Sequence, residues 1–565
     1  MQKLGWKRLL ALSCVFAIGA IGCGDDGDAD GQAVDAPSTT TATTTTTSPV
    51  RGGSITVAIV SEVAGLDPIV LGGSSSSGGI EGAAIYDTII RYNPETKQYE
   101  GRTAASLDPN ADFTEWTLKL KPGVRFGDGT PYDADAVKFN LDRHTASTSR
   151  SGSRAAILEF VQSITVVDPL TVRFTLKKGW SAFPFILTQN AGMIASPTAI
   201  RAAGAEFSTK PGKAGAGPFE VASYAPKESL VVRRNPTFYG GDVYLDQITF
   251  IPQGSGGDGA KLDGLNVGSV QVAVLSGGDP PVVAKAAEKY PAINRFSFAG
   301  SIVAMNAGVE VTCRAGQPAV HCVGKPDGTK VRTQPPTADV RVRKAVQAAI
   351  DPRVVNERAW EGKGLVHSSL FPKEFPWDPA VPGPAYDLVE AKRLVEEAKR
   401  TTGWNGVIRL LAPNDAASST VGLAVKTMLE LAGMQVAYSN QKDATGFISQ
   451  VTVDQDFDLV VPWSYSLSDD DGAYNNIFRD LNSPGARFGY TSADMDAAID
   501  SLRTAKNDDE KRAAYKRIAE IFNRDAPAAV LASRKVAIAH IPRLHGFQQS
   551  ATAVVFFDKV WLAAN

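Results

Sequence analysis

The sequence is poor in the residues and motifs that most often carry catalysis. Its 565 residues include only four cysteines and five histidines, and no two histidines have the HExxH spacing of a zinc peptidase. The chain also lacks a Gly-x-Ser-x-Gly nucleophile elbow and a phosphate-binding GxxxxGK(S/T) loop. Carboxylates are plentiful, so a glycan hydrolase built on an acidic pair stays open as an alternative. We expect no enzymatic activity, no cofactor and no metal site.

A charge imbalance and a long hydrophobic run are also missing. The net charge is −2, with 21% charged and 43% hydrophobic residues, which is the composition of an ordinary globular protein rather than of a nucleic-acid binder. The apolar run from Leu9 to Ile21 is shorter than the ~20 residues that a membrane-spanning helix needs, and no later segment offers a longer one. The sequence after residue 50 exceeds what one hydrophobic core usually serves, so we expect two or more lobes.

The first residues have the layout of an export signal. Basic residues between positions 3 and 8 precede the apolar run, which stops at small residues. The segment Ala20–Cys23 resembles the cleavage box of bacterial lipoproteins. The resemblance implies a signal peptide over residues 1–22 and a lipid on Cys23. The lipid would anchor the protein at the outer face of the cytoplasmic membrane, or in the periplasm. Cys14 is a poorer candidate, because too few apolar residues precede it. An ordinary secretory signal with an incidental cysteine is the alternative.

Residues 23–50 predict a solvated tether. They contain several aspartates, no lysine or arginine, and a threonine-rich run from Thr39 to Thr47. Such a segment buries too little apolar surface to offset the entropy lost on ordering it. The composition changes at Arg51, where we expect the folded part to begin.

Cys313 and Cys322 are the only cysteines after the signal region. They bracket a short loop with glycine and proline, and in an exported protein we expect them to form a disulfide. Closing so short a loop stabilises a fold by about 2 to 3 kcal/mol. A metal site is the alternative, but only His321 offers a further ligand nearby.

Strand-like and helix-like segments alternate along the folded part, as they do in α/β proteins. Apolar and alternating runs predict strands at residues 54–60, 116–120 and 124–126, and two more within 163–177. Asp133 is expected to cap one helix, and another is expected to begin near Asp339 with Arg341 and Arg343 on a charged outer face. Further helices are predicted over residues 386–400, 416–432, 493–503 and 508–524.

Several sequence blocks carry a resemblance to a known family. The most specific block runs from Trp116 to Pro131 and continues through Asp133–Val137. The other blocks are Gly52–Ala58, Gly215–Phe219, Arg234–Gly241, Asp339–Asp351, Gly489–Tyr490 and Asp525–Pro527. In this order they resemble the extracytoplasmic solute-binding proteins of ABC importers, family 5, which includes oligopeptide-, dipeptide- and nickel-binding proteins.

The resemblance implies an α/β fold of the periplasmic-binding-protein type, with two hinged lobes that enclose a ligand. It implies lobe I at residues 51–300 with an extra subdomain at about 95–190, lobe II at 301–532, and a return to lobe I at 533–565. It also implies a monomer whose partners are a peptide or other small-molecule ligand, the permease subunits of an ABC transporter, and a membrane reached through the lipid. No nucleic-acid partner is expected.

The first region predicted to face the ligand cleft is rich in glycine and serine. It contains Gly73, Ser74 and Ser75, shortly after β-strand-like residues 54–60. Composition alone would make this stretch a flexible linker. The resemblance instead places it at the cleft, where backbone groups and hydroxyls can bond a polar ligand.

The second region contains Trp463, Tyr465, Ser466, Asp469 and Asp470. Peptide-binding members place an aspartate for the ligand's amino group where this chain has Ser466, so free-amine peptides are disfavoured unless the aspartates at 469–471 replace it. The alternative is that these are solvated loop aspartates that cap the next segment. Trp463 and Tyr465 are expected to stack on the ligand, or else to belong to the core.

The predicted function is therefore capture of a solute by a lipid-anchored receptor for an ABC importer. Two alternatives remain at this point: a surface lipoprotein enzyme such as a glycan hydrolase, and a ligand-binding sensor without transport. The motifs identify a scaffold and do not name the ligand.

Overall fold

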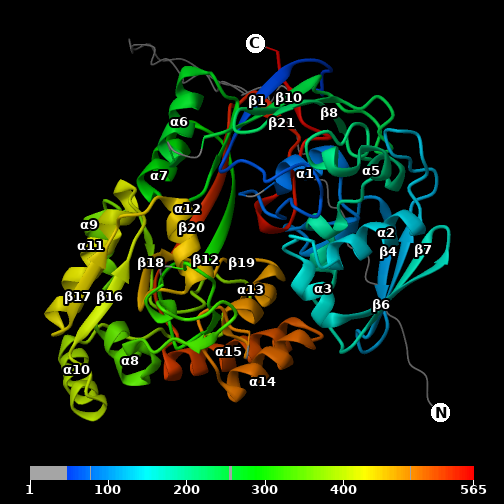
Figure 1. The fold of residues 1–565 in the computed structure, drawn as a ribbon. Coiled ribbons are helices and arrows are strands. Elements are labelled where there is room, and N and C mark those ends of the chain that lie inside the picture. Colours follow the sequence, from blue (N-terminus) through cyan, green and yellow to red (C-terminus); the bar gives the residue numbers. More distant parts are fainter. Residues whose placement is uncertain (1–47, 77, 254–256, 318, 484, 565) are drawn as a thin grey trace, which may run out of the picture. The chain divides into compact units, whose positions relative to one another are not determined.

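The computed structural model describes residues 48–564, except residues 77, 254–256, 318 and 484 (Figure 1). The predicted signal peptide at residues 1–22, the lipidation candidate Cys23 and the tether up to residue 47 lie outside the described residues. Regular structure begins with β1 (Ser54–Ile59), close to the change in composition at Arg51. Within the described part, no helix is both long and apolar enough to cross a membrane.

A twelve-stranded mixed sheet forms the frame of the molecule. Its main path has the order β17-β16-β18-β12-β20-β11-β1-β10-β9-β8. The bounds of these strands are β8 (Phe219–Ala225), β9 (Ser229–Arg234), β10 (Gln247–Pro252), β11 (Val272–Leu275), β12 (Ala292–Met305), β16 (Val407–Leu411), β17 (Gln435–Ser439), β18 (Leu459–Trp463) and β20 (Ala528–His540). Two short strands, β15 (Leu365–Val366) and β19 (Leu467–Ser468), pair with β20 and β12.

Two long strands in the middle of the sheet connect its halves. β12 and β20 pair antiparallel from Ala292↔Ala539 to Ala304↔Ala528. β20 also pairs with β11 and β12 with β18, so each long strand borders one half. We call the half with β11, β1, β10, β9 and β8 lobe I, and the half with β18, β16 and β17 lobe II (Figure 1). The register of β12 shifts between Ser297 and Ser301, and this β-bulge bends the strand between the two halves.

A separate four-stranded sheet follows β1 in the chain and forms a subdomain next to lobe I (Figure 1). Trp116, Leu118 and Leu120 are buried on one face of its β5 strand, as the alternating pattern predicts. Helix α2 (Ala134–Thr145) packs against this sheet and begins at Asp133, whose carboxylate accepts a hydrogen bond from the backbone. The strand bounds are β4 (Ala104–Pro109), β5 (Glu115–Leu120), β6 (Val161–Asp168) and β7 (Thr171–Leu176).

The predicted helices of lobe II are present, and each begins at a side-chain cap. Asp339, Asp387, Asp415, Ser492 and Asn507 accept hydrogen bonds from the first turns of five helices. These helices are α8 (Val340–Ala349), α10 (Leu388–Thr402), α11 (Ala416–Leu431), α14 (Ala493–Arg503) and α15 (Asp508–Asp525).

The other helices and hairpins are shorter and lie around the sheets. The remaining α-helices are α1 (Gly79–Tyr86), α3 (Arg154–Phe160), α4 (Pro184–Leu187), α5 (Pro197–Ala203), α6 (Gly257–Val267), α7 (Pro280–Lys289), α9 (Pro352–Ala359), α12 (Ala444–Ser449) and α13 (Gly472–Leu481). The hairpin pairs are β2 (Ile90–Asn93) with β3 (Gln98–Gly101), β13 (Glu310–Thr312) with β14 (Lys330–Arg332), β21 (Leu544–His545) with β24 (Trp561–Leu562), and β22 (Gln548–Gln549) with β23 (Val555–Phe556).

Two local expectations from the sequence are wrong. Residues 124–126 form no strand, because the chain turns back at Gly129 and leaves a single isolated bridge. Arg343 does not lie on a charged outer face of α8: it is only 7% exposed. Its guanidinium donates to three backbone carbonyls, those of Thr337, Ala338 and Asp525. These bonds compensate its burial and tie the start of α8 to the end of α15.

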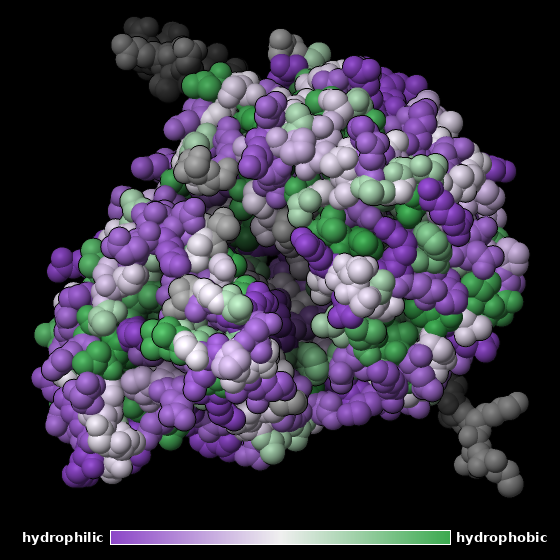
Figure 2. Space-filling model, in the orientation of Figure 1, coloured by the Kyte–Doolittle hydropathy of each residue, from purple (hydrophilic) through white to green (hydrophobic). Residues whose placement is uncertain are grey.

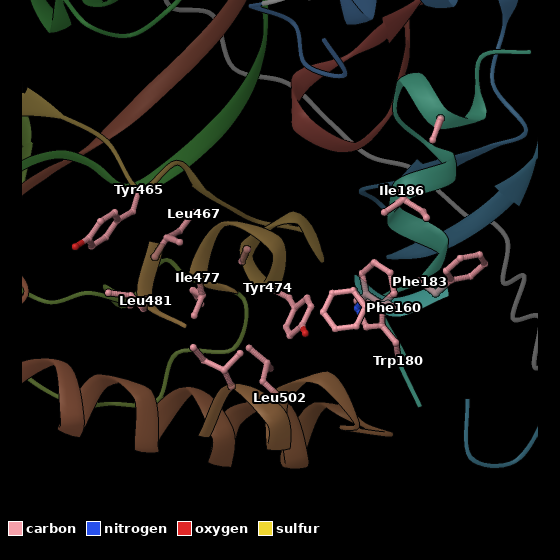
Figure 3. Close-up of a cluster of buried hydrophobic side chains, with 14 of the residues drawn as sticks. Phe160, Trp180, Phe183, Ile186, Tyr465, Leu467, Tyr474, Ile477, Leu481 and Leu502 are labelled. Atoms are coloured by element: carbon pink, nitrogen blue, oxygen red, sulfur yellow. The ribbon is translucent and has the colours of Figure 1, made fainter. Parts of the chain in front are cut away.

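Aromatic side chains join the subdomain to lobe II (Figure 3). Phe160 and Trp180 come from the subdomain, and Tyr474 and Phe478 come from α13. The ring of Phe160 lies 5.1 Å from that of Phe478 and 6.3 Å from that of Tyr474, and Trp180 lies 5.9 Å from Tyr474. The two parts therefore share one hydrophobic cluster in this arrangement.

Candidate functional site

The glycine- and serine-rich stretch before α1 is a packed loop. The Gly73 carbonyl accepts a hydrogen bond from Thr552 Oγ1 at 2.9 Å, and the Ser75 N–H donates to the Thr552 carbonyl at 3.2 Å. Ser75 is 5% exposed, and a Cβ atom on Gly73 would lie 2.2 Å from Oε1 of Gln189. The Ser74 carbonyl accepts from the first residue of α1 at 2.9 Å. Contacts with Thr552 and Gln189 thus hold this loop in place.

The aspartates predicted for the second region form internal ion pairs. Arg295 on β12 is 4% exposed, and its guanidinium donates to Asp469 Oδ1 at 2.9 Å and to Asp470 Oδ2 at 3.2 Å. Asp470 is fully buried and also accepts from the Ser468 hydroxyl and the Gly472 N–H. Burial raises the pKa of Asp469, and the guanidinium of Arg295 opposes that rise. The role of these carboxylates toward a ligand amine stays a prediction.

The aspartate stretch is also bonded to the other side of the molecule. Asp470 Oδ2 accepts from the Thr552 N–H at 3.0 Å, so Thr552 joins the two regions predicted from the sequence. Asp471 accepts from the Tyr99 hydroxyl of the β3 strand and from Lys511 of α15, both at 2.8 Å. These bonds connect lobe II to the parts of the chain that surround lobe I.

The aromatic residues of the second region point into the protein. Trp463 is 8% exposed, and its ring packs against those of Phe447 and Phe488. Tyr465 is 2% exposed and packs against the ring of Phe522. Ser466 is exposed and is 3.0 Å from the neighbouring Ser464 hydroxyl. Both rings therefore belong to the hydrophobic core, and stacking on a ligand stays a prediction.

A small cavity of about 20 Å³ lies where the lobes adjoin the two long strands. Lobe I contributes the turn that follows β11, and lobe II contributes the start of α11 and the end of β18. β12 contributes Ser301, and β20 contributes Ser533 and Arg534. The lining residues are Gly277, Gly278, Pro280, Ser301, Trp360, Ala417, Ser418, Val421, Pro462, Ala532, Ser533 and Arg534. This volume has room for about one water molecule, so a solute needs more space than this arrangement of the lobes provides.

The space-filling view shows a hollow between the two lobes (Figure 2). It opens between the elements around α1 and those around α12 and α13, as the matching orientation of the ribbon shows (Figure 1). Concave sites between domains are the usual places for ligands.

The sequence patterns did not indicate a role for Arg295, Thr552, Ser301 or Arg534. Arg534 did carry a signal, because it interrupts the apolar segment that forms β20. A cation within a buried strand needs a partner or a polar cavity. The other three become notable only through contacts with residues far away in the chain.

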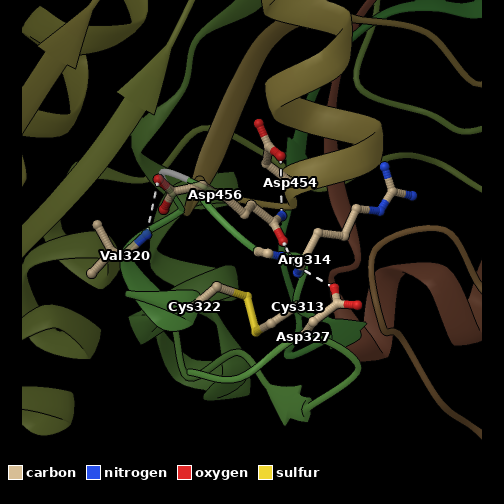
Figure 4. The surroundings of a disulfide bond; sticks show 9 residues. Cys313, Arg314, Val320, Cys322, Asp327, Asp454 and Asp456 are labelled. Atoms are coloured by element: carbon tan, nitrogen blue, oxygen red, sulfur yellow. Dashed lines mark hydrogen bonds between the residues drawn. A yellow bond between two sulfur atoms is a disulfide. The ribbon is translucent and has the colours of Figure 1, made fainter. Parts of the chain in front are cut away.

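Cys313 and Cys322 form a disulfide in the structure, with their Cα atoms 5.4 Å apart (Figure 4). The bond closes a loop between β13 and β14. The same segment is bonded to the region before β18, through Gln317 to Asp454 and through the Val320 N–H to Asp456. The disulfide joins two residues nine positions apart and serves as a local cross-link.

The two lobes, the connecting strands and the cavity between them define a solute-binding protein of the periplasmic type. The family model described as "Bacterial extracellular solute-binding proteins, family 5 Middle" matches residues 98–485. The chain therefore belongs to the family 5 extracellular solute-binding proteins, a family of ABC importer components. Members of this family are binding proteins rather than enzymes, which sets aside the glycan hydrolase alternative.

Relatives span nearly the whole chain. The glutathione-binding protein GsiB of Pectobacterium atrosepticum is 24% identical over 518 residues, covering 89% of this chain and 93% of the relative. Among solved structures, AgaA of A. tumefaciens R10 with agropinic acid has a TM-score of 0.70 at 18% identity, covering 91% of this chain and 99% of its own. AppA of Bacillus subtilis with a nonapeptide has a TM-score of 0.69 at 19% identity, covering 92% and 100%. These likenesses establish the mixed α/β fold of oligopeptide- and nickel-binding proteins.

Proposed function

We propose that this protein captures a small polar solute between its lobes and delivers it to the permease of an ABC importer. The observation that carries the proposal is the cavity at the middle of the sheet, which both lobes and both connecting strands line. A solute that contacts both lobes stabilises the closed arrangement, and a permease can recognise that arrangement.

Peptide-like solutes are the first candidates for this cavity. The names and titles of the relatives mention glutathione, a nonapeptide and agropinic acid, which are polar molecules of different sizes. Ser466 supplies no charge at the place where peptide-binding members hold an amino group, which favours solutes without a free ammonium group there.

Membrane attachment through Cys23 is part of the same proposal. It rests on the sequence of the signal region. The division into lobe I at 51–300 and 533–565 and lobe II at 301–532 is also a proposal, and it rests on the family resemblance of the sequence. Cells that express the full chain are labelled with a palmitate analogue. Label on the wild type and none on Cys23→Ala is the expected result. Equal labelling of the variant would show that the lipid is attached to another residue. A wild type without label would contradict lipidation.

Native mass spectrometry of the freshly purified protein, followed by titration calorimetry with small peptides, amino acids and sugars, tests capture. We expect one co-purified or added small polar solute to bind at a stoichiometry of one. Absence of binding by every solute would contradict capture. Uptake of the bound solute is then compared in cells with and without the cognate permease. Unchanged uptake would favour the sensor alternative over transport.

A further inference from the structure

One charged side chain at the cavity has no protein partner. Arg534 lines the cavity from β20, and among the described residues no carboxylate forms an ion pair with its guanidinium and no group accepts a hydrogen bond from it. Burial lowers the pKa of Arg534, and more distant acids oppose this only in part. Arg534 is half-buried and its guanidinium nitrogens keep contact with solvent, so its unpaired positive charge is available to a ligand with the opposite charge.

The acids nearest to Arg534 are engaged elsewhere. Asp258 is buried and pairs with Lys261 at 2.9 Å, so these two charges neutralise each other. Its oxygens also accept from Ser276 and Gly277. Asp415 is exposed to solvent, and its carboxylate caps α11. The positive charge of Arg534 is therefore not cancelled within the protein.

A second unsatisfied donor lies beside Arg534. Ser301 is 2% exposed and lines the same cavity, and its buried hydroxyl has no hydrogen-bond partner in the part of the chain that the structure describes. The β-bulge in β12 sets its position opposite Ala532. Gly300 precedes it, and a Cβ atom there would lie 2.8 Å from Arg534 Cγ. Glycine at this position thus leaves room for the arginine side chain.

The start of α11 borders the same cavity. Ala417 and Ser418 line the cavity in the first turn of this helix of 16 residues. The N-terminal charge of this helix is already met, because the Asp415 carboxylate accepts a hydrogen bond from the Ser418 N–H. The features of the cavity that favour negative charge are therefore the guanidinium of Arg534 and the hydroxyl of Ser301.

We propose that this cavity binds a carboxylate of the captured solute, with Arg534 as the cation and Ser301 as a further donor. The planar fork of an arginine matches the two oxygens of a carboxylate. This inference rests on the proposed function and narrows its substrate class to small acids, including peptides with a free carboxyl terminus. It makes Arg534 a residue that determines specificity.

Pairs of compounds that differ only in the acid group test the inference. The probes are dialanine, N-acetylalanine and glutarate, each compared with its neutral amide by titration calorimetry. The variants are Arg534→Gln and Ser301→Ala. Lys535→Gln is the matched control, because it removes the same charge from the next residue of β20, whose side chain points to the other face of the strand.

We expect at least one acid to bind more tightly than its amide. Arg534→Gln should raise the Kd of that acid by about 10- to 100-fold and erase the difference between acid and amide. Lys535→Gln should leave the Kd of the acid within about twofold of the wild-type value. Ser301→Ala should raise it about 5-fold without lowering Tm, since the hydroxyl has no protein partner to lose.

Two results would overturn the inference. Amides that bind as tightly as acids, or an acid Kd unchanged in Arg534→Gln, would refute carboxylate recognition while capture of a solute stands. Failure of every probe to bind the wild type, while a co-purified neutral solute is found, would also refute it and leave capture intact. Failure of every probe with no solute found in any assay would refute both proposals.

Discussion

Truncating Tyr474 is expected to shift the balance between the closed and open arrangements of the lobes. Tyr474 is 2% exposed, and its ring contacts Phe160 and Trp180 of the subdomain. Each aromatic pair contributes about 0.5 to 1.5 kcal/mol beyond the burial of its area. Tyr474→Ala removes both pairs, so the closed arrangement should lose about 1 to 3 kcal/mol relative to an open one in which the rings are apart.

That loss corresponds to about a 5- to 150-fold change in the ratio of closed to open molecules. If the solute binds the closed form, its Kd should rise by up to the same factor once the open form predominates. The matched control is Tyr474→Phe. The tyrosine hydroxyl is buried and finds no hydrogen-bond partner among the described residues, so its removal should be close to neutral.

Pulsed electron paramagnetic resonance measures the distance between one spin label on the subdomain and one on lobe II, and so reports directly whether these two parts are close together or apart. We expect Tyr474→Ala to add a longer distance that Tyr474→Phe lacks, and saturating solute to suppress it. Tm is recorded as well, because a truncated core tyrosine also destabilises the fold. An unchanged distance distribution together with an unchanged Kd would refute the idea that these rings hold the lobes together.

Three other variants test single features. Glu81 is 1% exposed with an unpartnered oxygen, and burial raises its pKa to about 7. Between the pKa of the unfolded carboxyl and that of the folded one, the folded carboxyl keeps its proton while the unfolded one has lost it, so the free energy of unfolding should fall by about 3 kcal/mol as pH rises from about 4.5 to above 7. In Glu81→Gln, Tm measured by thermal melts should depend less on pH across that range. The same dependence of Tm on pH in wild type and variant would refute this. Replacing Cys313 and Cys322 by serine should remove about 2 to 3 kcal/mol of stabilisation and so speed proteolysis of their loop, while the solute Kd stays unchanged. A changed Kd would connect the loop to binding. Trp463→Ala should lower Tm, because truncating a ring packed in the core costs about 3 to 5 kcal/mol of folding free energy. An unchanged Tm with weaker binding would instead support stacking of this ring on the solute.

Local features of the fold were predictable because their causes are local. Asp133 and Asp339 precede apolar positions at helical spacing, and both cap the helices that were expected. The burial of Arg343 was not predictable, because one of its partners is the carbonyl of Asp525 in a distant helix. A helical pattern alone does not show which polar residues meet another element.

The candidate site was predictable only as two separate regions. The loop with Gly73 and the stretch with Asp470 meet through Thr552, which is 479 residues from the first and 82 from the second. Nothing in the sequence near Thr552 indicates that contact. Arg534 shows the other limit: its charge within an apolar strand indicates a special environment, but only the fold shows that the environment is a cavity without an acid partner.

The β-bulge in β12 has a mechanical consequence. Between the paired positions Ser297↔Arg534 and Ser301↔Ala532, three residues of β12 face a single residue of β20, so the ladder that joins the lobes is interrupted there. Bending stiffness is lowest where inter-strand bonds are missing, so lobe rotation should concentrate at this point rather than spread along the strands. Arg534 and Ser301 flank the same point. A solute held by both residues would therefore stiffen the pivot itself as well as fill the space between the lobes.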